Sequence, residues 1–134
     1  MADIESNTVN EKGFAATSRV GNYELSIDAT NKEGPNPNEV LLADYASCYT
    51  FAFRAGASRE HDLDLGKIET AASADINDED DIADDSVAFT LKVEAELDDD
   101  QIAELIELGE EICHVHAVLR EEIHADITVE ADAF

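Results

Sequence analysis

The chain contains two cysteines, Cys48 and Cys113, and each lies in an apolar segment with a helical pattern. Asp44 precedes Cys48 by one helical turn, and His114 and His116 adjoin Cys113. A thiol pair can carry out two-electron redox chemistry without a metal or an organic cofactor, because one sulfur takes up oxygen and the other resolves the resulting sulfenic acid. The alternative is that each cysteine is simply a small, buried apolar residue.

The first third of the chain carries the pattern of a β-hairpin. Two segments, Phe14 to Arg19 and Tyr23 to Ile27, flank Val20-Gly21-Asn22, and apolar residues alternate from Tyr23 onward. A Gly-Asn pair between two such segments is typical of a tight hairpin turn. A loop at residues 31–35 then separates the hairpin from the next element.

A long helix is predicted directly after this loop. Asn36 suits the N-cap, Pro37 suits the first helical position, and Glu39 stands three residues after the cap. The pattern runs to about His61 and is apolar on nearly every face, so this helix must be buried on every side. A chain of 134 residues can cover one side of this helix with its own sheet. The other side must be covered by a partner chain. We therefore expect an obligate homodimer with this helix near its centre.

The second half of the chain predicts further strands and one more helix. Alternating apolar residues indicate strands at Lys67 to Ile76, Val87 to Ala95 and Ile123 to Val129. Residues 77–85 form an acidic connection that we interpret as a solvated loop. Acidic side chains open a second helix at residues 98–100, and a short helix follows Cys113. The predicted order is β-β-α-β-β-α-β, and residues 1–134 are expected to form one α+β domain.

The chain is strongly acidic, with 33 Asp and Glu against 8 Lys and Arg and a formal net charge of −25. Such a surface repels phosphate backbones and anionic lipids, so we expect no nucleic acid and no membrane as partners. Its self-repulsion is screened at high salt, which predicts a salt-adapted cytoplasmic protein. A high net charge also suits a disordered chain, but the long, regular apolar segments favour a folded one.

The sequence offers little sign of secretion, membrane insertion or metal binding. No basic-then-apolar leader opens the chain, and the apolar stretch from Val40 to Ala55 is interrupted by two charged residues and is shorter than a membrane span. His114 and His116 beside Cys113 are too few for a metal site without further clustered ligands. We expect neither a metal nor a cofactor. His116 is expected either to tune Cys113 or to lie on the surface.

Two motifs around the cysteines resemble the signatures of the OsmC/Ohr family, the osmotically inducible and organic hydroperoxide resistance proteins. The segment Asn36-Pro37-Asn38-Glu39-Val40, followed by Ala43, Ala46 and Cys48, is similar to Asn/Ser-Pro-x-x-Leu/Val-x-x-Ala-x-x-Ala-x-Cys. The segment from Cys113 to Leu119 is similar to Cys-Pro-x-Ser-x-x-Leu. The resemblance covers nearly the whole chain, including the order of its elements.

This resemblance implies an intertwined homodimer, with long central helices packed between sheets. It also implies a thiol peroxidase that reduces organic hydroperoxides and is regenerated by a dithiol reductant. Cys48 would be the peroxidatic nucleophile and Cys113 the resolving thiol. An apolar lining from Leu41, Tyr45, Tyr49 and Phe51 would favour organic over hydrogen peroxide. Arg19, by its position in the hairpin, would hold Cys48 as a thiolate. Arg54 is a rival cation that we expect to form a salt bridge instead.

The chain departs from the family pattern at positions that matter for activity. Asn38 stands where the peroxidase branch has a glutamate, and Glu39 is better explained as the capping partner of Asn36. His114 and His116 replace the proline and the serine of the second motif. These departures leave open a binding or stress-related protein of this fold with little peroxidase activity. A static Cys48–Cys113 crosslink is a third alternative, which a cytoplasmic location disfavours.

Overall fold

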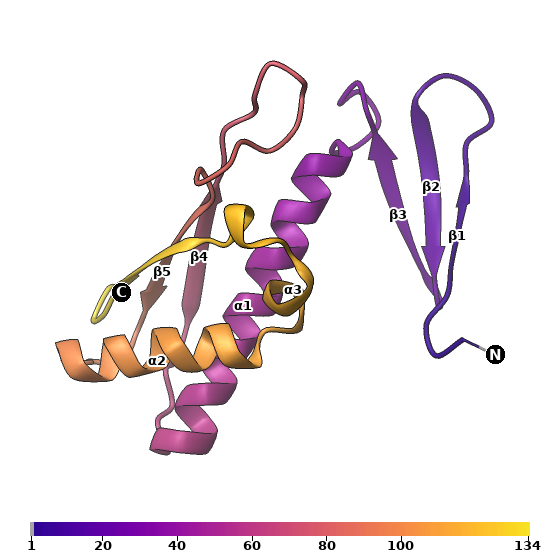
Figure 1. Cartoon of the computed structure of the whole chain (residues 1–134). Helices are drawn as coiled ribbons and strands as arrows, with labels where there is room; N and C mark the ends of the chain where they lie inside the picture. Colours follow the sequence, from indigo (N-terminus) through magenta and orange to yellow (C-terminus); the bar gives the residue numbers. More distant parts are fainter. Residues whose placement is uncertain (1) are drawn as a thin grey trace. The chain divides into compact units, whose positions relative to one another are not determined.

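The computed structural model describes residues 2–134, which divide into two compact units, residues 2–41 and residues 42–134 (Figure 1). The N-terminal unit contains one sheet and the first residues of a long helix. The C-terminal unit contains the rest of that helix, a second sheet and the remaining helices. The fold is mixed α+β with two three-stranded sheets.

The sheet of the N-terminal unit is fully antiparallel, in the order β1-β2-β3. Strands β2 (Ala15–Val20) and β3 (Tyr23–Asp28) form the predicted hairpin, and Val20 pairs with Tyr23 across the turn. Strand β1 (Ser6–Val9) was not predicted. It is short, mostly polar and fully exposed, so its only reason to be a strand is its pairing with β2.

Helix α1 (Pro37–His61) begins and ends where the sequence predicts. The Asn36 side chain accepts a hydrogen bond from the Glu39 backbone N–H at 2.9 Å, and the Glu39 carboxylate accepts one from the Asn36 N–H at 2.9 Å. This is the predicted capping box. One face of α1 is buried within the C-terminal unit, while Phe51 on the opposite side is 70% exposed.

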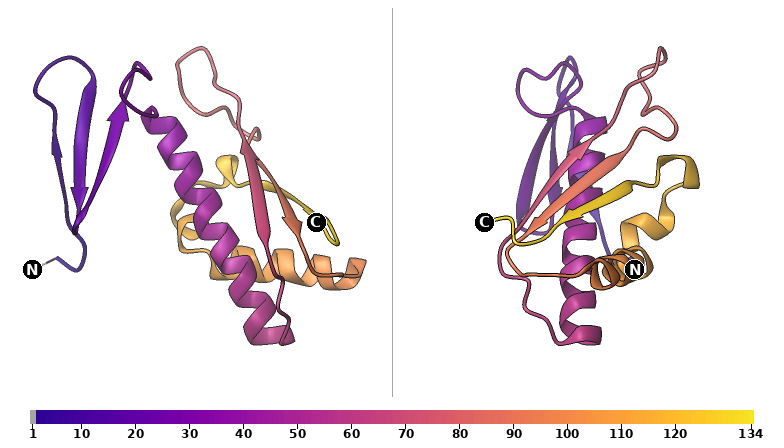
Figure 2. Two further views of the ribbon diagram at one scale, coloured as in Figure 1. Left: turned by 180° about the vertical axis from the view of Figure 1, so that it is seen from behind. Right: turned by 90° about the vertical axis from the view of Figure 1, so that its left-hand side faces the viewer.

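The sheet of the C-terminal unit has the order β4-β5-β6 and packs against α1 (Figure 2). Strands β4 (Ile68–Ser73) and β5 (Ala88–Val93) are antiparallel, whereas β6 (Asp126–Glu130) runs parallel to β5. A parallel pair needs a crossover connection, and helix α2 (Asp99–Ile112) lies within it. The ring of Phe89 on β5 lies 4.7 Å from that of Tyr45 on α1, between centroids. Both rings belong to the hydrophobic core of this unit.

Helix α2 (Asp99–Ile112) crosses α1 (Figure 1) and leads through Cys113 into the short helix α3 (His114–Val118). Asp98 and Gln101 form a capping box at the start of α2, in agreement with the predicted acidic N-terminus. A single 3-10 turn (Glu121–Ile123) then precedes β6. The last strand is therefore shifted toward the C-terminus from its predicted position, because residues 121–123 form this turn instead of extended backbone.

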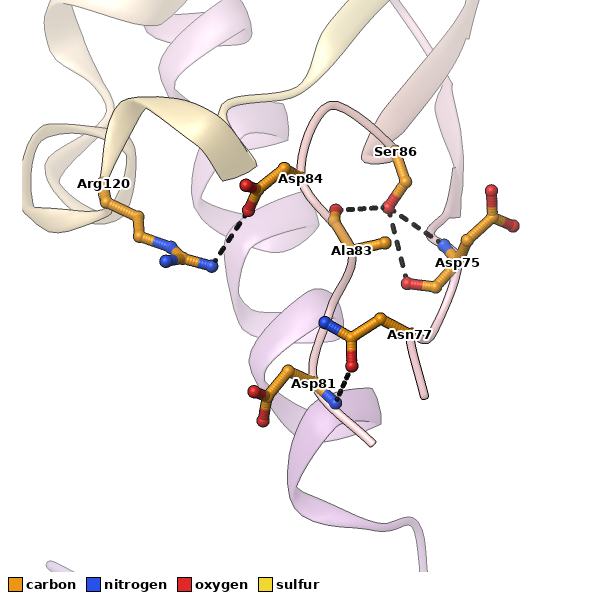
Figure 3. Close-up of polar contacts among 7 residues, drawn as sticks. All are labelled: Asp75, Asn77, Asp81, Ala83, Asp84, Ser86 and Arg120. Atoms are coloured by element: carbon orange, nitrogen blue, oxygen red, sulfur yellow. Dashed lines mark hydrogen bonds and ion pairs between the residues drawn. The ribbon is translucent and has the colours of Figure 1, made fainter. Parts of the chain in front are cut away.

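The acidic connection between β4 and β5 is a loop, as predicted, and its own polar groups hold it in shape (Figure 3). The Asn77 side chain accepts a hydrogen bond from the Asp81 backbone N–H at 3.0 Å. The Ser86 hydroxyl donates to the carbonyl of Ala83 at 2.7 Å. Arg120 forms an ion pair with Asp84 at 3.1 Å. The predicted strand at residues 67–76 is consequently shorter, and Ile76 makes only an isolated bridge with Ile82.

Candidate functional site: a thiol pair between two helices

Cys48 lies in the middle of α1 and is partly buried. It borders the buried face of the helix, one turn after Tyr45 and one residue before Tyr49, both of which belong to the core. Asp44, one turn earlier, is exposed. Cys48 is therefore placed by the same packing that fixes α1 on the C-terminal sheet.

Cys113 occupies the junction between α2 and α3 and is 1% exposed. Its backbone N–H donates to the carbonyl of Gly109 at 2.9 Å, which closes the last turn of α2. Its sulfur accepts a hydrogen bond from the His116 backbone N–H at 3.4 Å, so the thiol is the N-cap of α3. Two helices thus fix the position of this sulfur.

The Cys48 thiol is a neighbour that influences the pKa of Cys113, and both cysteines are free. The pKa of Cys113 is raised from 9.0 to about 11, first by burial and then by a hydrogen-bonding interaction with the Cys48 thiol and by the charge of Cys48. The His116 N–H works in the opposite direction. Cys113 is therefore a neutral thiol at neutral pH, next to a more accessible one. Two adjacent thiols can give up two electrons by forming a disulfide.

A hydrogen-bonded cluster around Cys113 was not foreseen as a unit from the sequence. The Tyr45 hydroxyl lies 2.7 Å from Nδ1 of His116, and the Ala125 backbone N–H donates to the same hydroxyl at 3.0 Å. The His116 ring stacks on His124 with their centroids 3.8 Å apart. His116 is half-buried, so its interpretation as a surface residue was wrong. The His-x-His sequence beside Cys113 was the available signal.

The expected apolar lining of the thiol pair is only partly realised. Tyr45 and Tyr49 are buried in the core, where Tyr49 donates a hydrogen bond to the carbonyl of Ile106 at 3.0 Å. Burial raises the pKa of both tyrosines, so both hydroxyls keep their protons. These side chains fill the space between α1, α2 and the sheet, because the chain itself covers this face of α1.

The histidines of the second motif do not converge on a common point. His114 is exposed, whereas His116 faces Tyr45 and His124. Among residues 2–134, no three or more His, Cys, Asp or Glu side chains are grouped so that they could hold a metal ion.

The two candidate cations have different surroundings. Arg19 belongs to the N-terminal unit, where it forms an exposed ion pair of 2.5 Å with Glu24, its partner across the hairpin. It also lines an open hollow of about 630 Å³ on that sheet. Arg54 lies 4.0 Å from Asp64 and donates to the carbonyl of Gly66, which confirms the expected salt bridge. The role of Arg19 toward Cys48 stays a prediction.

Residues 29–128 match the family model described as OsmC-like protein. The chain belongs to the OsmC-like protein family. The matched segment includes both cysteine motifs and crosses both compact units. A protein of Haloferax volcanii is 52% identical over 134 residues, which cover 100% of both chains. The resemblance predicted from the two motifs is thereby confirmed.

Solved structures of OsmC-like proteins share the fold at low sequence identity. The OsmC-like protein of Mycoplasma pneumoniae is 16% identical with a TM-score of 0.79, and the match covers 97% of this chain and 96% of that one. The organic hydroperoxide resistance protein OhrB of Bacillus subtilis is 20% identical with a TM-score of 0.66, over 97% and 98% of the two chains. These likenesses confirm the predicted OsmC-like fold.

The first cysteine motif of this OsmC-like protein departs from the family pattern at one position. Asn38 stands at the position expected for a glutamate, and Glu39 is engaged in the capping box with Asn36. Glu39 therefore does not substitute for the missing carboxylate. Within residues 2–134, none of the helices has the length and the apolar character needed to cross a bilayer.

Proposed function

We propose that this protein is a thiol-dependent peroxidase that reduces organic hydroperoxides through Cys48 and Cys113. The observation that supports the proposal is the pair of free, neighbouring thiols, one partly buried and one buried and neutral. Family membership supports it, because two structures of the same fold carry the name organic hydroperoxide resistance protein, from Bacillus subtilis and from Elizabethkingia anophelis.

The reaction proceeds in three balanced steps. The Cys48 thiolate attacks the peroxide oxygen that bears the proton, and the O–O bond breaks. Cys48 becomes a sulfenic acid, and the leaving alkoxide takes up a proton from water to give the alcohol. The Cys113 thiol then attacks the Cys48 sulfur, which forms the disulfide and releases water. A dithiol reductant finally exchanges with the disulfide, which restores both thiols and oxidises the reductant. Arg19 is the cation that we propose to stabilise the thiolate.

The experiment is a thiol count before and after one equivalent of cumene hydroperoxide. We expect the wild-type protein to lose two thiols per chain without a crosslink between chains. Cys113→Ser should lose its one thiol in a single turnover, and Cys48→Ser should consume no peroxide. A Cys48→Ser protein as active as the wild type would overturn the proposal. Arg19→Ala, with Glu24→Gln as its control, tests the role of the guanidinium.

A second candidate is a binding protein of the same fold with little peroxidase activity. Asn38 in place of the expected glutamate favours it, since Glu39 is committed to the helix cap. The thiol count separates the two candidates, because a binding protein keeps both thiols in the presence of hydroperoxide. Asn38→Glu should raise the rate of thiol loss if the missing carboxylate limits the activity.

We further propose that the protein works as a homodimer in the cytoplasm of salt-adapted cells. The dimer is supported by the exposed apolar side chains of Phe51 on α1 and of Tyr23 and Leu25 on the N-terminal sheet. The salt adaptation is supported by the net charge of −25 and by the 52% identical protein of Haloferax volcanii.

A further inference from the structure

Helix α3 is too short to hold its own position. It has five residues, from His114 to Val118, and none of them is buried. Helices of this length are unstable in isolation, so contacts with the rest of the protein must hold it in place. Its N-cap is Cys113, and a side-chain hydrogen bond joins its His116 to Tyr45 on α1. The Tyr45–His116 bond therefore helps to hold α3 in place, and with it the His116 N–H that donates to the Cys113 sulfur.

The direction of the Tyr45–His116 hydrogen bond follows from its surroundings. The Tyr45 oxygen accepts a hydrogen bond from the Ala125 backbone N–H at 3.0 Å. Tyr45 is buried and keeps its own proton, which it donates to Nδ1 of His116 at 2.7 Å. With Tyr45 as the donor, His116 is neutral and carries its proton on Nε2.

This bond connects the two cysteine-bearing segments one helical turn from each sulfur. Tyr45 precedes Cys48 by three residues on α1, and His116 follows Cys113 by three residues. We propose that the Tyr45–His116 hydrogen bond is a positioning contact that holds the Cys113 thiol against Cys48 and so favours their disulfide. Preorganisation of this kind raises the effective concentration of one group at the other. The use of this disulfide in peroxide reduction rests on the proposed function. The stability of the disulfide does not depend on that function.

The bond also makes the thiol pair sensitive to acid. The groups facing His116 are Tyr45 from α1, the stacked ring of His124, and Cys113 at the start of α3; Glu110 on α2 interacts with His124. Burial, and next the charge of His124, lower the pKa of His116 below its ordinary value of 6.5. The acceptor at Nδ1 is present above that pKa and is lost as the pH falls through it.

The test measures the equilibrium between the Cys48–Cys113 disulfide and dithiothreitol, with no peroxide present. In this exchange the two protein thiols pass their electrons and protons to oxidised dithiothreitol as the protein disulfide forms. Tyr45→Phe and His116→Gln should each lower the equilibrium constant about fivefold at pH 7, the factor that one ordinary hydrogen bond contributes. The double variant should lose no more than either single variant.

His116→Asn is the matched control, because an asparagine oxygen falls near the place of Nδ1 but does not titrate. We expect His116→Asn to stay within twofold of the wild type at pH 7. As the pH is lowered, the equilibrium constant for disulfide formation should fall more in the wild type than in His116→Asn. Constants for Tyr45→Phe and His116→Gln equal to that of the folded wild type would overturn the proposal, as would the same acid dependence in His116→Asn. Lack of activity with hydroperoxide, by contrast, would refute only the proposed function.

Discussion

The ring of Tyr49 on α1 lies directly against the backbone of Gly109 on α2. A methyl group at position 109 would come within 2.9 Å of the phenol carbon that bears the hydroxyl. Tyr49 is fully buried and donates a hydrogen bond to the carbonyl of Ile106 at 3.0 Å, so its ring is fixed. Gly109 in turn accepts the hydrogen bond from the Cys113 N–H. The close crossing of the two helices therefore sets where Cys113 lies.

Gly109→Ala is predicted to destabilise the protein. Alanine improves the helix propensity of α2 by about 1 kcal/mol. Overpacking against a fixed ring costs roughly 1–3 kcal/mol, so we expect a net loss of about 1 kcal/mol in the free energy of unfolding, measured by urea denaturation. Glu111→Ala, an exposed change on the same helix, should alter it by less than ~0.5 kcal/mol. A more stable Gly109→Ala protein would contradict this packing.

Cys113 is predicted to titrate near pH 11 in the reduced protein. Its pKa is raised from 9.0 to about 11, mainly because it is buried. The rate of its alkylation, followed by mass spectrometry of the Cys113 peptide, should rise with pH up to that value. The raised pKa also contributes stability below pH 9 that is lost as the pH rises from 9 through 11. An alkylation midpoint below pH 9 would show that the thiol is not held in this environment.

Asp28 is predicted to stabilise the loop after β3 down to low pH. Its carboxylate accepts hydrogen bonds from the Thr30 hydroxyl, the Thr30 N–H and the Glu33 N–H at 2.7–2.9 Å, and these lower its pKa from 3.8 to about 2. The stabilisation is present above pH 3.8 and is lost as the pH falls through 2. Hydrogen exchange at Thr30 and Glu33 should be faster in Asp28→Asn than in the wild type at pH 7. This difference should fall to about half near pH 2 and disappear below it.

Salt is predicted to stabilise the folded protein. The net charge is −25, and raising the ionic strength from 0.1 M to 1 M shortens the screening length from about 10 Å to about 3 Å. The melting temperature should therefore rise with KCl and rise equally with NaCl. Sucrose at an osmolality matched to the KCl should raise it less, since sucrose does not screen charge. A melting temperature that is independent of KCl would refute the electrostatic explanation.

Phe51→Asp is predicted to convert a dimer into monomers. Phe51 lies on α1 and is 70% exposed in the single chain, and a charge placed in an apolar interface is strongly unfavourable. Light scattering coupled to size-exclusion chromatography should show the wild type at twice the mass of the variant. Ser58→Asp, also on the exposed side of α1 but two turns further on, tests whether the effect is local to Phe51. A monomeric wild-type protein would rule out the proposed dimer.

The sequence alone determined the parts of the fold that depend on neighbours along the chain. The capping box of Asn36 and Glu39 and the turn at Gly21-Asn22 involve residues only a few positions apart, so their spacing is readable directly. The same holds for the two motifs that identify the family. Strand β1 was not predicted, because its mostly polar residues show no alternating apolar pattern. They form a strand only through pairing with β2.

The tertiary structure alone decided how the two cysteines are placed. Their spacing in the sequence does not show that Cys113 caps α3, that it is buried, or that Cys48 influences its pKa. Those relationships arise where α2 crosses α1 at Gly109 and where Tyr45 reaches His116. Contacts of this kind join residues more than fifty positions apart, and they exist only after the core has packed. The residue types therefore indicate which chemistry is possible, while the packing of the helices determines which side chains are placed to carry it out.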